Sequence, residues 1–176
     1  MPQCKRSATV LLLLVLCVGC DRLTKDAAQT YVAVEPSYSW FRDTVRLEYT
    51  ENSGAFLSLG GSLSKEVRVL LFQVFPALWL VALGLYLVLT KSASMFLTVA
   101  WSLVLAGGLG NLLDRLIHDG RVIDFMNLGI GSVRTGIFNV ADVCITLGVL
   151  LLMVQSIRDA VFRREDRSVG TSGRSF

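Results

Sequence analysis

Four long apolar stretches, separated by polar segments, dominate the pattern of the chain. They cover residues 7–28, 69–90, 94–117 and 137–157. Each holds roughly the 20 residues that an α-helix needs to cross the hydrocarbon core of a bilayer. The second stretch contains no charged residue at all. The pattern therefore predicts an α-helical integral membrane protein with four transmembrane helices.

Two of the connecting loops are long enough to have structure of their own, and both lie on one side of the membrane. They cover residues 29–68 and 118–136, whereas only residues 91–93 join the two middle spans. Residues 45–50 alternate between apolar and polar side chains, which is the period of a half-buried strand, and a turn sequence follows at 52–54. We expect a small β-sheet and loop region on the periplasmic, or extracytoplasmic, side.

The spans and loops form one domain, residues 1–162, without internal repeats. Residues 163–176 mix charged residues with serine and glycine and show no apolar period. This composition predicts a disordered cytoplasmic tail.

Composition agrees with the membrane assignment. Hydrophobic residues make up 53% of the 176 residues and charged residues only 18%, whereas soluble domains average about 25% charged residues. The net charge of +3 is small, and no basic patch supports binding of nucleic acid.

The distribution of basic residues predicts the orientation. Lysine and arginine beside the spans concentrate before the first span, in the tight middle loop and after the fourth span, which favours cytoplasmic positions for both termini. These residues are Lys5, Arg6, Lys91, Arg158, Arg163, Arg164 and Arg167.

The N-terminal segment also has features of a bacterial lipoprotein leader, because Val18-Gly19-Cys20 follows a basic start and an apolar run. An acidic residue and a lysine continue the same segment, and three further spans follow. We therefore expect this segment to remain as a helix.

Cysteine and histidine usage narrows the possible chemistry. The four cysteines, at positions 4, 17, 20 and 144, suggest no disulfide framework. The one histidine, His118, cannot supply the several imidazoles of a catalytic zinc site. We expect no metal and a solvent-exposed His118.

Polar residues of several spans converge near one membrane face. In this orientation, Asp21 lies roughly 21 Å along the first helix at about 1.5 Å per residue, and Asp142 lies roughly 8 Å into the fourth. Asn111, Asp114 and Arg115 share one face at the end of the third span. Because charges in or near the fatty layer are costly, they are rare without a function.

Each of these residues also has a purely structural interpretation. Asp21 and Lys25 can be an interfacial ion pair, and Asn139 with Asp142 can be a helix N-cap and a first-turn acid. Asp124 on its own is typical of a solvated turn. Close helix packing is the ordinary role of the three glycines Gly107, Gly108 and Gly110.

Two of the acids suit a hydrolytic reaction. Two carboxylates held close together in a partly dry site cannot both ionise, so they share one proton. The ionised acid can take a proton from water while the other protonates the carbonyl oxygen or the leaving amine. Asp124 and Asp142 are the candidates. Donors for a substrate backbone, and a cation for Asp21 or Asp114, are available in Asn52, Asn111, Asn139, Arg115 and Lys25.

Five blocks in a fixed order carry a resemblance to a known family. They are Asp21-Arg22-Leu23-Thr24-Lys25, Asn52-Ser53-Gly54-Ala55-Phe56, Gly110-Asn111-Leu112-Leu113-Asp114-Arg115, Val122-Ile123-Asp124-Phe125 and Phe138-Asn139-Val140-Ala141-Asp142. Along almost its whole length the chain resembles the type II, or lipoprotein, signal peptidases of bacteria. One departure is that the family usually reads Asn-x-Gly-Ala-Ala-Phe where Phe56 here follows Ala55 directly.

The resemblance implies an aspartic endopeptidase of the bacterial cytoplasmic (inner) membrane, with its active site near the outer leaflet. It would cleave prolipoprotein signal peptides N-terminal to the diacylglyceryl-modified cysteine, with Asp124 and Asp142 as catalytic dyad and no cofactor. Asn111 and Arg115 would hold the substrate backbone. We expect a monomer in contact with membrane lipid. The positions that shape the site would be Asp21, Lys25, Asn52, Gly108, Asn111, Asp114, Arg115, Asn139 and Ala141.

Two other functions fit parts of the pattern. A serine peptidase would use Lys25 as base and one of four serines in the first long loop as nucleophile, namely Ser53, Ser58, Ser62 or Ser64. A small proton-coupled carrier would use the acids within the spans as a relay. A relay should cross the bilayer, however, and residues 69–90 and 92–113 contain no charged residue, which argues against it.

Overall fold

Four long helices and a small sheet make up the structure. The computed structural model describes residues 3–34, 37–55, 58–90 and 94–172, with side chains described as far as Val161. Within these ranges, four helical stretches are long and apolar enough to cross a membrane, and this confirms the predicted fold class. They are Gln3–Val32, Lys65–Leu89, Met95–Ile117 and Val140–Val161.

Two of these stretches contain a π-helical turn. Helix α1 (Gln3–Ala27) continues through the turn η1 (Ala28–Val32). The second stretch consists of α2 (Lys65–Val69), the turn η3 (Leu70–Val74) and α3 (Phe75–Leu89). The third is α4 (Met95–Ile117), which Ser94 caps by accepting a hydrogen bond from the backbone N–H of Leu97.

Helix α5 (Val140–Ser172) begins later and extends further than the apolar pattern indicates. It begins after Asn139, whose side chain accepts a hydrogen bond from the backbone N–H of Asp142 at 3.0 Å, while Phe138 is bridged to strand residue Met126. Its helical backbone runs through residues 163–172, the first part of the predicted tail. No proline or glycine interrupts this segment before Gly170, and residues 173–176 lie outside the described residues.

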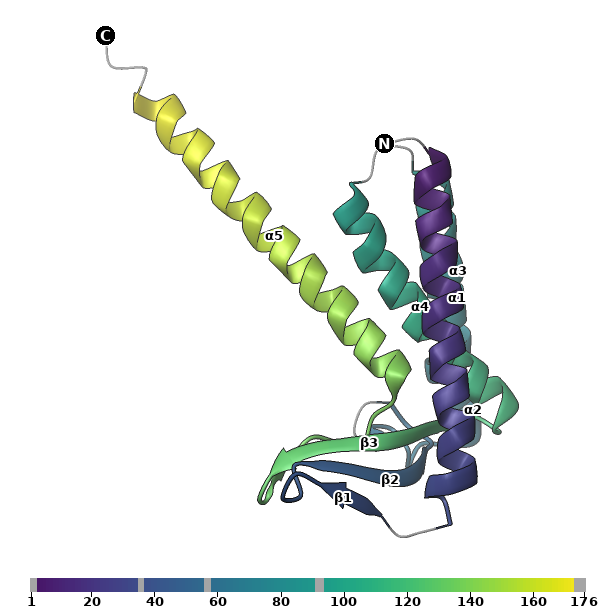
Figure 1. Ribbon diagram of the computed structural model, residues 1–176. Helices are drawn as coiled ribbons and strands as arrows, with labels where there is room; N and C mark the ends of the chain where they lie inside the picture. Colours follow the sequence, from purple (N-terminus) through teal and green to yellow (C-terminus); the bar gives the residue numbers. More distant parts are fainter. Residues whose placement is uncertain (1–2, 35–36, 56–57, 91–93, 173–176) are drawn as a thin grey trace.

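The sheet lies across one end of the helices (Figure 1). It has four strands in the order β1 (Tyr38–Trp40), β2 (Val45–Asn52), β3 (Val122–Ile130) and β4 (Val133–Arg134), each antiparallel to its neighbour. The predicted strand at 45–50 lies within β2. The sequence pattern assigns residues 118–136 to a connecting loop and misses a strand there, because residues 122–130 form β3. Since the first half of β3 is buried on both faces, it lacks the alternation that marks a half-buried strand.

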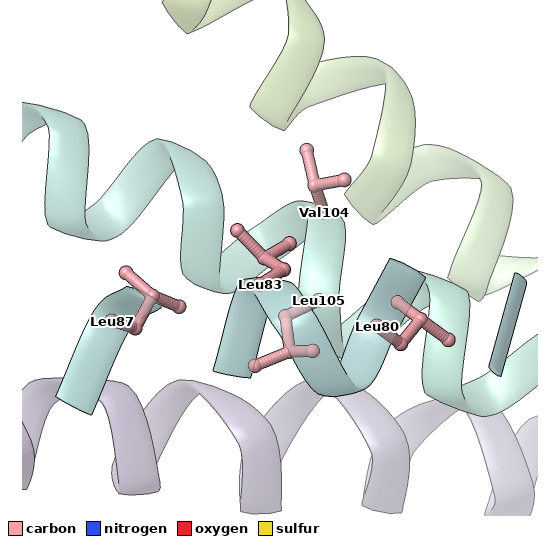
Figure 2. Close-up of a cluster of buried hydrophobic side chains, with 5 residues drawn as sticks. All are labelled: Leu80, Leu83, Leu87, Val104 and Leu105. Atoms are coloured by element: carbon pink, nitrogen blue, oxygen red, sulfur yellow. The ribbon is translucent and has the colours of Figure 1, made fainter. Parts of the chain in front are cut away.

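Leucine and valine side chains fill the space between the middle helices (Figure 2). Leu80, Leu83 and Leu87 of α3 pack against Val104 and Leu105 of α4, and all five are at most 7% exposed. Most other apolar side chains on α1, α3 and α5 face outward, as expected where lipid covers the helices.

Small residues let α4 approach its neighbours closely. A Cβ atom on Gly107 would overlap the carbonyl oxygen of Ala141 in α5, and one on Gly110 would lie 2.7 Å from a carboxylate oxygen of Asp21 in α1. About two turns further along α5, a Cβ on Gly148 would lie 2.7 Å from the carbonyl oxygen of Ala100. Beyond these contacts α5 leans away from the bundle (Figure 1).

At the end of the bundle opposite the sheet, one arginine joins three helices. The buried Arg6 of α1 donates to the side chain of Thr98 in α4 and to the backbone carbonyl of Thr90, which directly follows α3. A side chain from the basic N-terminus thus fixes the ends of the spans instead of only facing solvent.

Replacing Gly107 by alanine should destabilise the protein. The added methyl group must push the Ala141 backbone away, and overpacking of this kind costs about 1–3 kcal/mol. Thermal unfolding in detergent should show a lower Tm for Gly107→Ala. The matched control is Gly84→Ala, where the new Cβ meets nothing within 4 Å. Equal Tm values for both variants would contradict the close approach of α4 and α5.

Candidate active site

The candidate site lies where the sheet meets the helices. Asp124 sits on β3 opposite Thr50 of β2, and its side chain is buried, with 3% exposed. Asp142 occupies the first turn of α5. The β3 strand and the start of α5 thus bring to one place two acids that lie far apart along the chain.

A single amide side chain contacts both acids. The Nδ2 atom of Asn139 donates to Oδ1 of Asp124 at 2.6 Å. The Asn139 backbone N–H donates to Oδ2 of Asp142 at 3.2 Å, and its Oδ1 accepts from the Asp142 backbone N–H at 3.0 Å. Asn139 is fully buried. It is therefore a helix cap, as one interpretation expected, and also the link between the two carboxyl groups.

The second oxygen of Asp124 is held from the sheet. Asn52, at the end of β2, donates from Nδ2 to Oδ2 of Asp124 at 3.1 Å and to the Ala55 carbonyl at 3.1 Å. Its own Oδ1 accepts from the Gly54 backbone N–H at 2.9 Å. Asn52 therefore closes the predicted turn and orients Asp124. Phe56, where the block departs from the family pattern, lies outside the described residues.

Asn111 of α4 holds the other acid. Its Nδ2 donates to Oδ1 of Asp142 at 2.8 Å. Its Oδ1 accepts from Nδ2 of Asn139 at 3.1 Å and from Nζ of Lys25 at 3.3 Å. Two asparagines and two acids thus form one hydrogen-bonded network that reaches Lys25.

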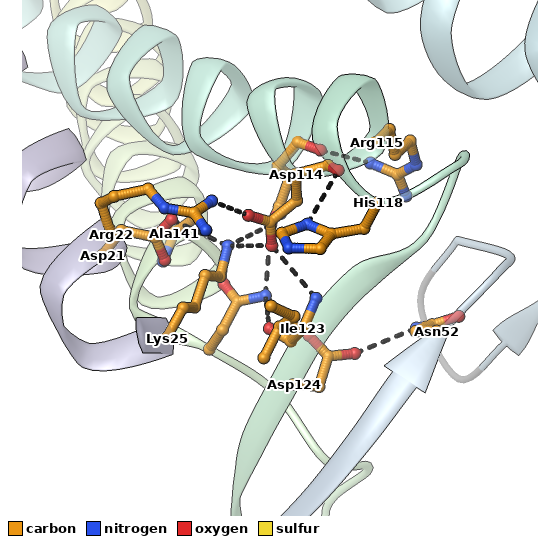
Figure 3. Close-up of polar contacts among 12 residues, drawn as sticks. Asp21, Arg22, Lys25, Asn52, Asp114, Arg115, His118, Ile123, Asp124 and Ala141 are labelled. Atoms are coloured by element: carbon orange, nitrogen blue, oxygen red, sulfur yellow. Dashed lines mark hydrogen bonds and ion pairs between the residues drawn. The ribbon is translucent and has the colours of Figure 1, made fainter. Parts of the chain in front are cut away.

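Buried charges lie directly behind this network (Figure 3). The fully buried Lys25 ammonium lies 2.8 Å from a carboxylate oxygen of Asp21 and 2.8 Å from one of Asp114. Arg22 pairs with the other oxygen of Asp114 at 2.7 Å. Two carboxylates thus meet two cations. Because burial is expensive for an unpaired charge, each of these groups depends on the partners that it has here.

These charges also hold the backbone beside each candidate acid. Asp21 accepts a hydrogen bond from the backbone N–H of Ala141 at 2.8 Å, and Ala141 directly precedes Asp142. Asp114 accepts from the backbone N–H of Ile123 at 3.0 Å, and Ile123 directly precedes Asp124. The buried ions therefore position both acids through neighbouring peptide groups.

Arg115 connects α4 to the turn that contains Asn52. Its guanidinium donates to the carbonyl oxygens of Asn111 and Gly54, at 3.2 and 2.9 Å, and lies 5.9 Å from the centre of the Phe72 ring. Gly108 stands apart from the network, because the position of its missing Cβ faces Leu80 of α3 at 2.6 Å. Gly108 therefore allows α4 to pack closely against α3.

Two residues near the site were not anticipated. Arg22 belongs to the first block but was not selected, although it precedes Asp26 by four positions and pairs with it at 3.0 Å. The spacing of four positions was the signal for this pair in the sequence. The contact of Arg22 with Asp114 had no such signal, because the two residues lie 92 positions apart. His118 is half-buried instead of exposed, with Nδ1 3.1 Å from the Asp114 carbonyl oxygen, because it caps the end of α4.

The surroundings of Asp124 change its acidity. Burial raises the pKa of its carboxyl group, and the neighbouring Asp142 carboxylate raises it further, to about 6. The amides of Asn52 and Asn139 act in the opposite direction but do not offset these two effects. A solvated turn acid would have an ordinary pKa, so Asp124 is not of that kind.

Comparison with known proteins identifies the family. The sequence model described as signal peptidase (SPase) II matches residues 13–158. The chain belongs to the signal peptidase II family. This confirms the resemblance carried by the five blocks, all of which lie within the matched residues, and makes the chain a membrane peptidase.

Relatives and solved structures agree with this family. The lipoprotein signal peptidase of Streptococcus pneumoniae is 30% identical over 157 residues, or 89% of this chain and 97% of the relative. That of Staphylococcus haemolyticus is 33% identical over 140 residues, or 80% and 85%. A bacterial membrane enzyme solved by the in meso method at 1.9 Å resolution has a TM-score of 0.75 at 31% identity, covering 86% of this chain and 94% of that one.

The raised pKa of Asp124 predicts a pH-dependent effect on stability. Between its ordinary value of 3.8 and about 6, the folded protein binds a proton that the unfolded chain has released. The free energy of unfolding should therefore fall as the pH rises through this window, by about 2–3 kcal/mol. Asp124→Asn lacks this effect.

The measurement is the Tm of the parent and of Asp124→Asn in detergent between pH 4 and pH 7.5. The Tm of Asp124→Asn minus that of the parent should increase as the pH is raised. A difference that stays constant over the whole range would show that Asp124 has an ordinary pKa.

Proposed function

We propose that this signal peptidase II is an aspartic endopeptidase that removes signal peptides from bacterial prolipoproteins, N-terminal to the diacylglyceryl-modified cysteine. Asp124 and Asp142 are its catalytic pair. The observation that supports this proposal best is the shared contact with Asn139, which brings both carboxyl groups into one buried network.

The two acids would activate water and protonate the peptide in turn. The ionised carboxylate takes a proton from water as the water oxygen bonds to the scissile carbonyl carbon, and the protonated acid donates to the carbonyl oxygen. The C–N bond then breaks while a proton passes to the leaving amine. A pKa of about 6 for Asp124 lets this group exchange protons readily near neutral pH.

The surrounding asparagines keep the pair ready for this reaction. Asn52 and Asn139 hold the two oxygens of Asp124, while Asn111 and the Asn139 backbone hold those of Asp142. Because donors fixed in advance need not reorganise during the reaction, they are worth more than mobile ones. Asn111 and Arg115 are the proposed contacts to the substrate backbone, and the full set of supporting residues is Asp21, Lys25, Asn52, Gly108, Asn111, Asp114, Arg115, Asn139 and Ala141.

A lipid-bearing substrate suits the outer surface of this site. The relatives from Streptococcus and Staphylococcus are named lipoprotein signal peptidases. Apolar side chains on the helices beside the site, among them Leu23 and Leu116, are largely exposed. Acyl chains of a modified cysteine can lie against them in the lipid without entering the protein.

We also propose a bacterial inner-membrane location with both termini cytoplasmic and the site near the outer leaflet, and residues 1–162 as one monomeric domain. Arg6 and the basic end of α5 support the orientation, since they lie at the end opposite the sheet. Exposed aromatic side chains gather at the sheet end, as in membrane interfaces; they are Tyr31, Tyr38, Trp40 and Phe41.

The structure disfavours a serine peptidase with Lys25 as base. The Lys25 ammonium is fully buried and is occupied by Asp21, Asp114 and Asn111. A proton carrier is disfavoured as well, because the polar network stays at one end of the bundle. The middle of the bundle is filled by the leucines and valines of α3 and α4.

Replacing either acid by its amide should abolish cleavage. Asp124→Asn and Asp142→Asn each remove an acid–base group, a loss of about 10²–10⁴-fold in rate. The measurement is the initial rate at which the purified protein cleaves a precursor carrying a diacylglyceryl-cysteine, with the cleavage site identified by mass spectrometry. The matched control, Asp159→Asn, makes the same change near the far end of α5 and should retain full activity.

The same assay, run with the unlipidated precursor, tests the substrate. Cleavage only of the lipidated form, on the N-terminal side of the cysteine, is the expected result. Activity retained in a well-folded Asp124→Asn or Asp142→Asn protein would contradict the catalytic pair. Equal cleavage of both precursors would contradict the lipid requirement but leave the pair intact.

A further inference from the structure

A second polar cavity lies next to the candidate active site, between α2 and the end of α4. Its volume is about 180 Å³, enough for several water molecules, and it is lined by charged and polar groups from both helices and from the segment after α4. Three of its lining residues are cations, Lys65, Arg68 and Arg115, and one is an acid, Asp119. The proposed peptidase reaction does not use Lys65, Arg68 or Asp119.

The charges in this cavity are not balanced. Lys65 pairs with Asp119 at 2.9 Å, so these two neutralise each other. The Arg68 side chain makes no hydrogen bond or ion pair with any residue in the described part of the chain, and its Nε atom is shielded from solvent. Arg68 lines the cavity. The terminal nitrogens of Arg115 donate hydrogen bonds to two uncharged carbonyl groups. The Arg115 charge also faces the acids of the candidate site. Arg68 is therefore the cation of this lining that has no ion pair among the described residues.

An apolar groove continues from this cavity along the second span. The groove has a volume of about 570 Å³ and shares Lys65 and Val69 with the cavity; Glu66, Leu70 and Val74 form the rest of its lining. The Glu66 carboxylate lies at the Lys65 end, so an acyl chain would lie along the apolar part. Leu70 and Val74 are 47% and 42% exposed. Because this stretch belongs to a helix that crosses the membrane, the groove faces the lipid. The cavity thus adjoins a shallow, largely apolar groove at the two residues that they share, Lys65 and Val69.

We propose that this pair of cavities binds an anionic phospholipid of the membrane, with its phosphate between Arg68 and Lys65 and an acyl chain along Leu70 and Val74. Arginine binds phosphate oxygens through two parallel N–H donors, and lysine adds a mobile point charge. Free phosphate could use the same donors, but it would leave the apolar groove without a role. The groove therefore favours a lipid over a soluble anion.

Asp119 would oppose this binding. It lines the cavity and accepts a hydrogen bond from Lys65, whose charge lowers the pKa of the Asp119 carboxyl group. A lipid phosphate must compete with this carboxylate for Lys65. Removing the carboxylate should therefore strengthen lipid binding, which damage to the fold would not do.

Native mass spectrometry of the purified full-length protein tests the proposal. The protein, in lipid-free detergent, is titrated with dioleoyl phosphatidylglycerol, with zwitterionic dioleoyl phosphatidylcholine, and with phosphatidylglycerol in the presence of inorganic phosphate. We expect roughly ten- to hundredfold tighter binding of phosphatidylglycerol than of phosphatidylcholine, because both lipids carry the phosphate but the quaternary ammonium of phosphatidylcholine brings a positive charge next to Lys65 and Arg68. Inorganic phosphate at millimolar concentration should not displace the lipid.

Four variants show whether the preference comes from this cavity. Arg68→Gln and Lys65→Gln should each lose most of the preference, and Asp119→Asn should bind phosphatidylglycerol several-fold more tightly. Arg42→Gln makes the same change of charge at an exposed residue in the turn between β1 and β2, and should match the parent. Lys65 is exposed, so its variant remains informative if Arg68→Gln folds poorly.

Three results would overturn the proposal. The first is equal binding of the two phospholipids by the parent. The second is an unchanged preference in Arg68→Gln and Lys65→Gln. The third is displacement of phosphatidylglycerol by inorganic phosphate, which would show a site for soluble anions instead of a lipid site.

Discussion

The arrangement of the site depends on the burial of Lys25 between Asp21 and Asp114. A buried ammonium must have anionic partners, and these two lie on different helices, so the ion pairs join α1 to α4. Each carboxylate also accepts a hydrogen bond from a backbone N–H. Asp21 accepts from Ala141, and Asp114 accepts from Ile123. Since these peptide groups directly precede Asp142 and Asp124, one cluster of charges sets the positions of both acids.

This arrangement separates the ions that hold the fold from the acids that would react. Arg22 and Lys25 balance Asp21 and Asp114, which leaves Asp124 and Asp142 to the uncharged amides of Asn52, Asn111 and Asn139. Without a directly paired cation, Asp124 responds mainly to burial and to Asp142, and its pKa is raised. Asp124 thus keeps the capacity to exchange a proton that a buried salt bridge would remove.

Features with a regular pattern along the chain could be predicted from the sequence. Long apolar runs predict the four spans, and alternation predicts β2. The strand β3 was missed because burial of both faces removes alternation.

The helical spacing of Asp21 and Lys25 predicts their ion pair. The contact of Asp21 with Ala141 spans 120 positions, and no local pattern encodes it. Asp124 alone is typical of a solvated turn, and only its hydrogen bonds to Asn52 of the neighbouring strand and to the cap residue Asn139 explain its burial. The resemblance to a known family indicated which of these residues form one site, whereas local sequence patterns could not.

The central claim is that Asp124 and Asp142 influence each other across Asn139. The most direct measurement is a pH titration of the Asp124 side-chain carboxyl carbon by ¹³C NMR, in the parent and in Asp142→Asn. We expect a midpoint near pH 6 in the parent and a lower midpoint in the variant, because the neighbouring negative charge is gone. Asp43, whose pKa is held below its usual range by Arg46 on the sheet, should titrate alike in both proteins. The same midpoint for Asp124 with and without the Asp142 carboxylate would contradict the coupled pair.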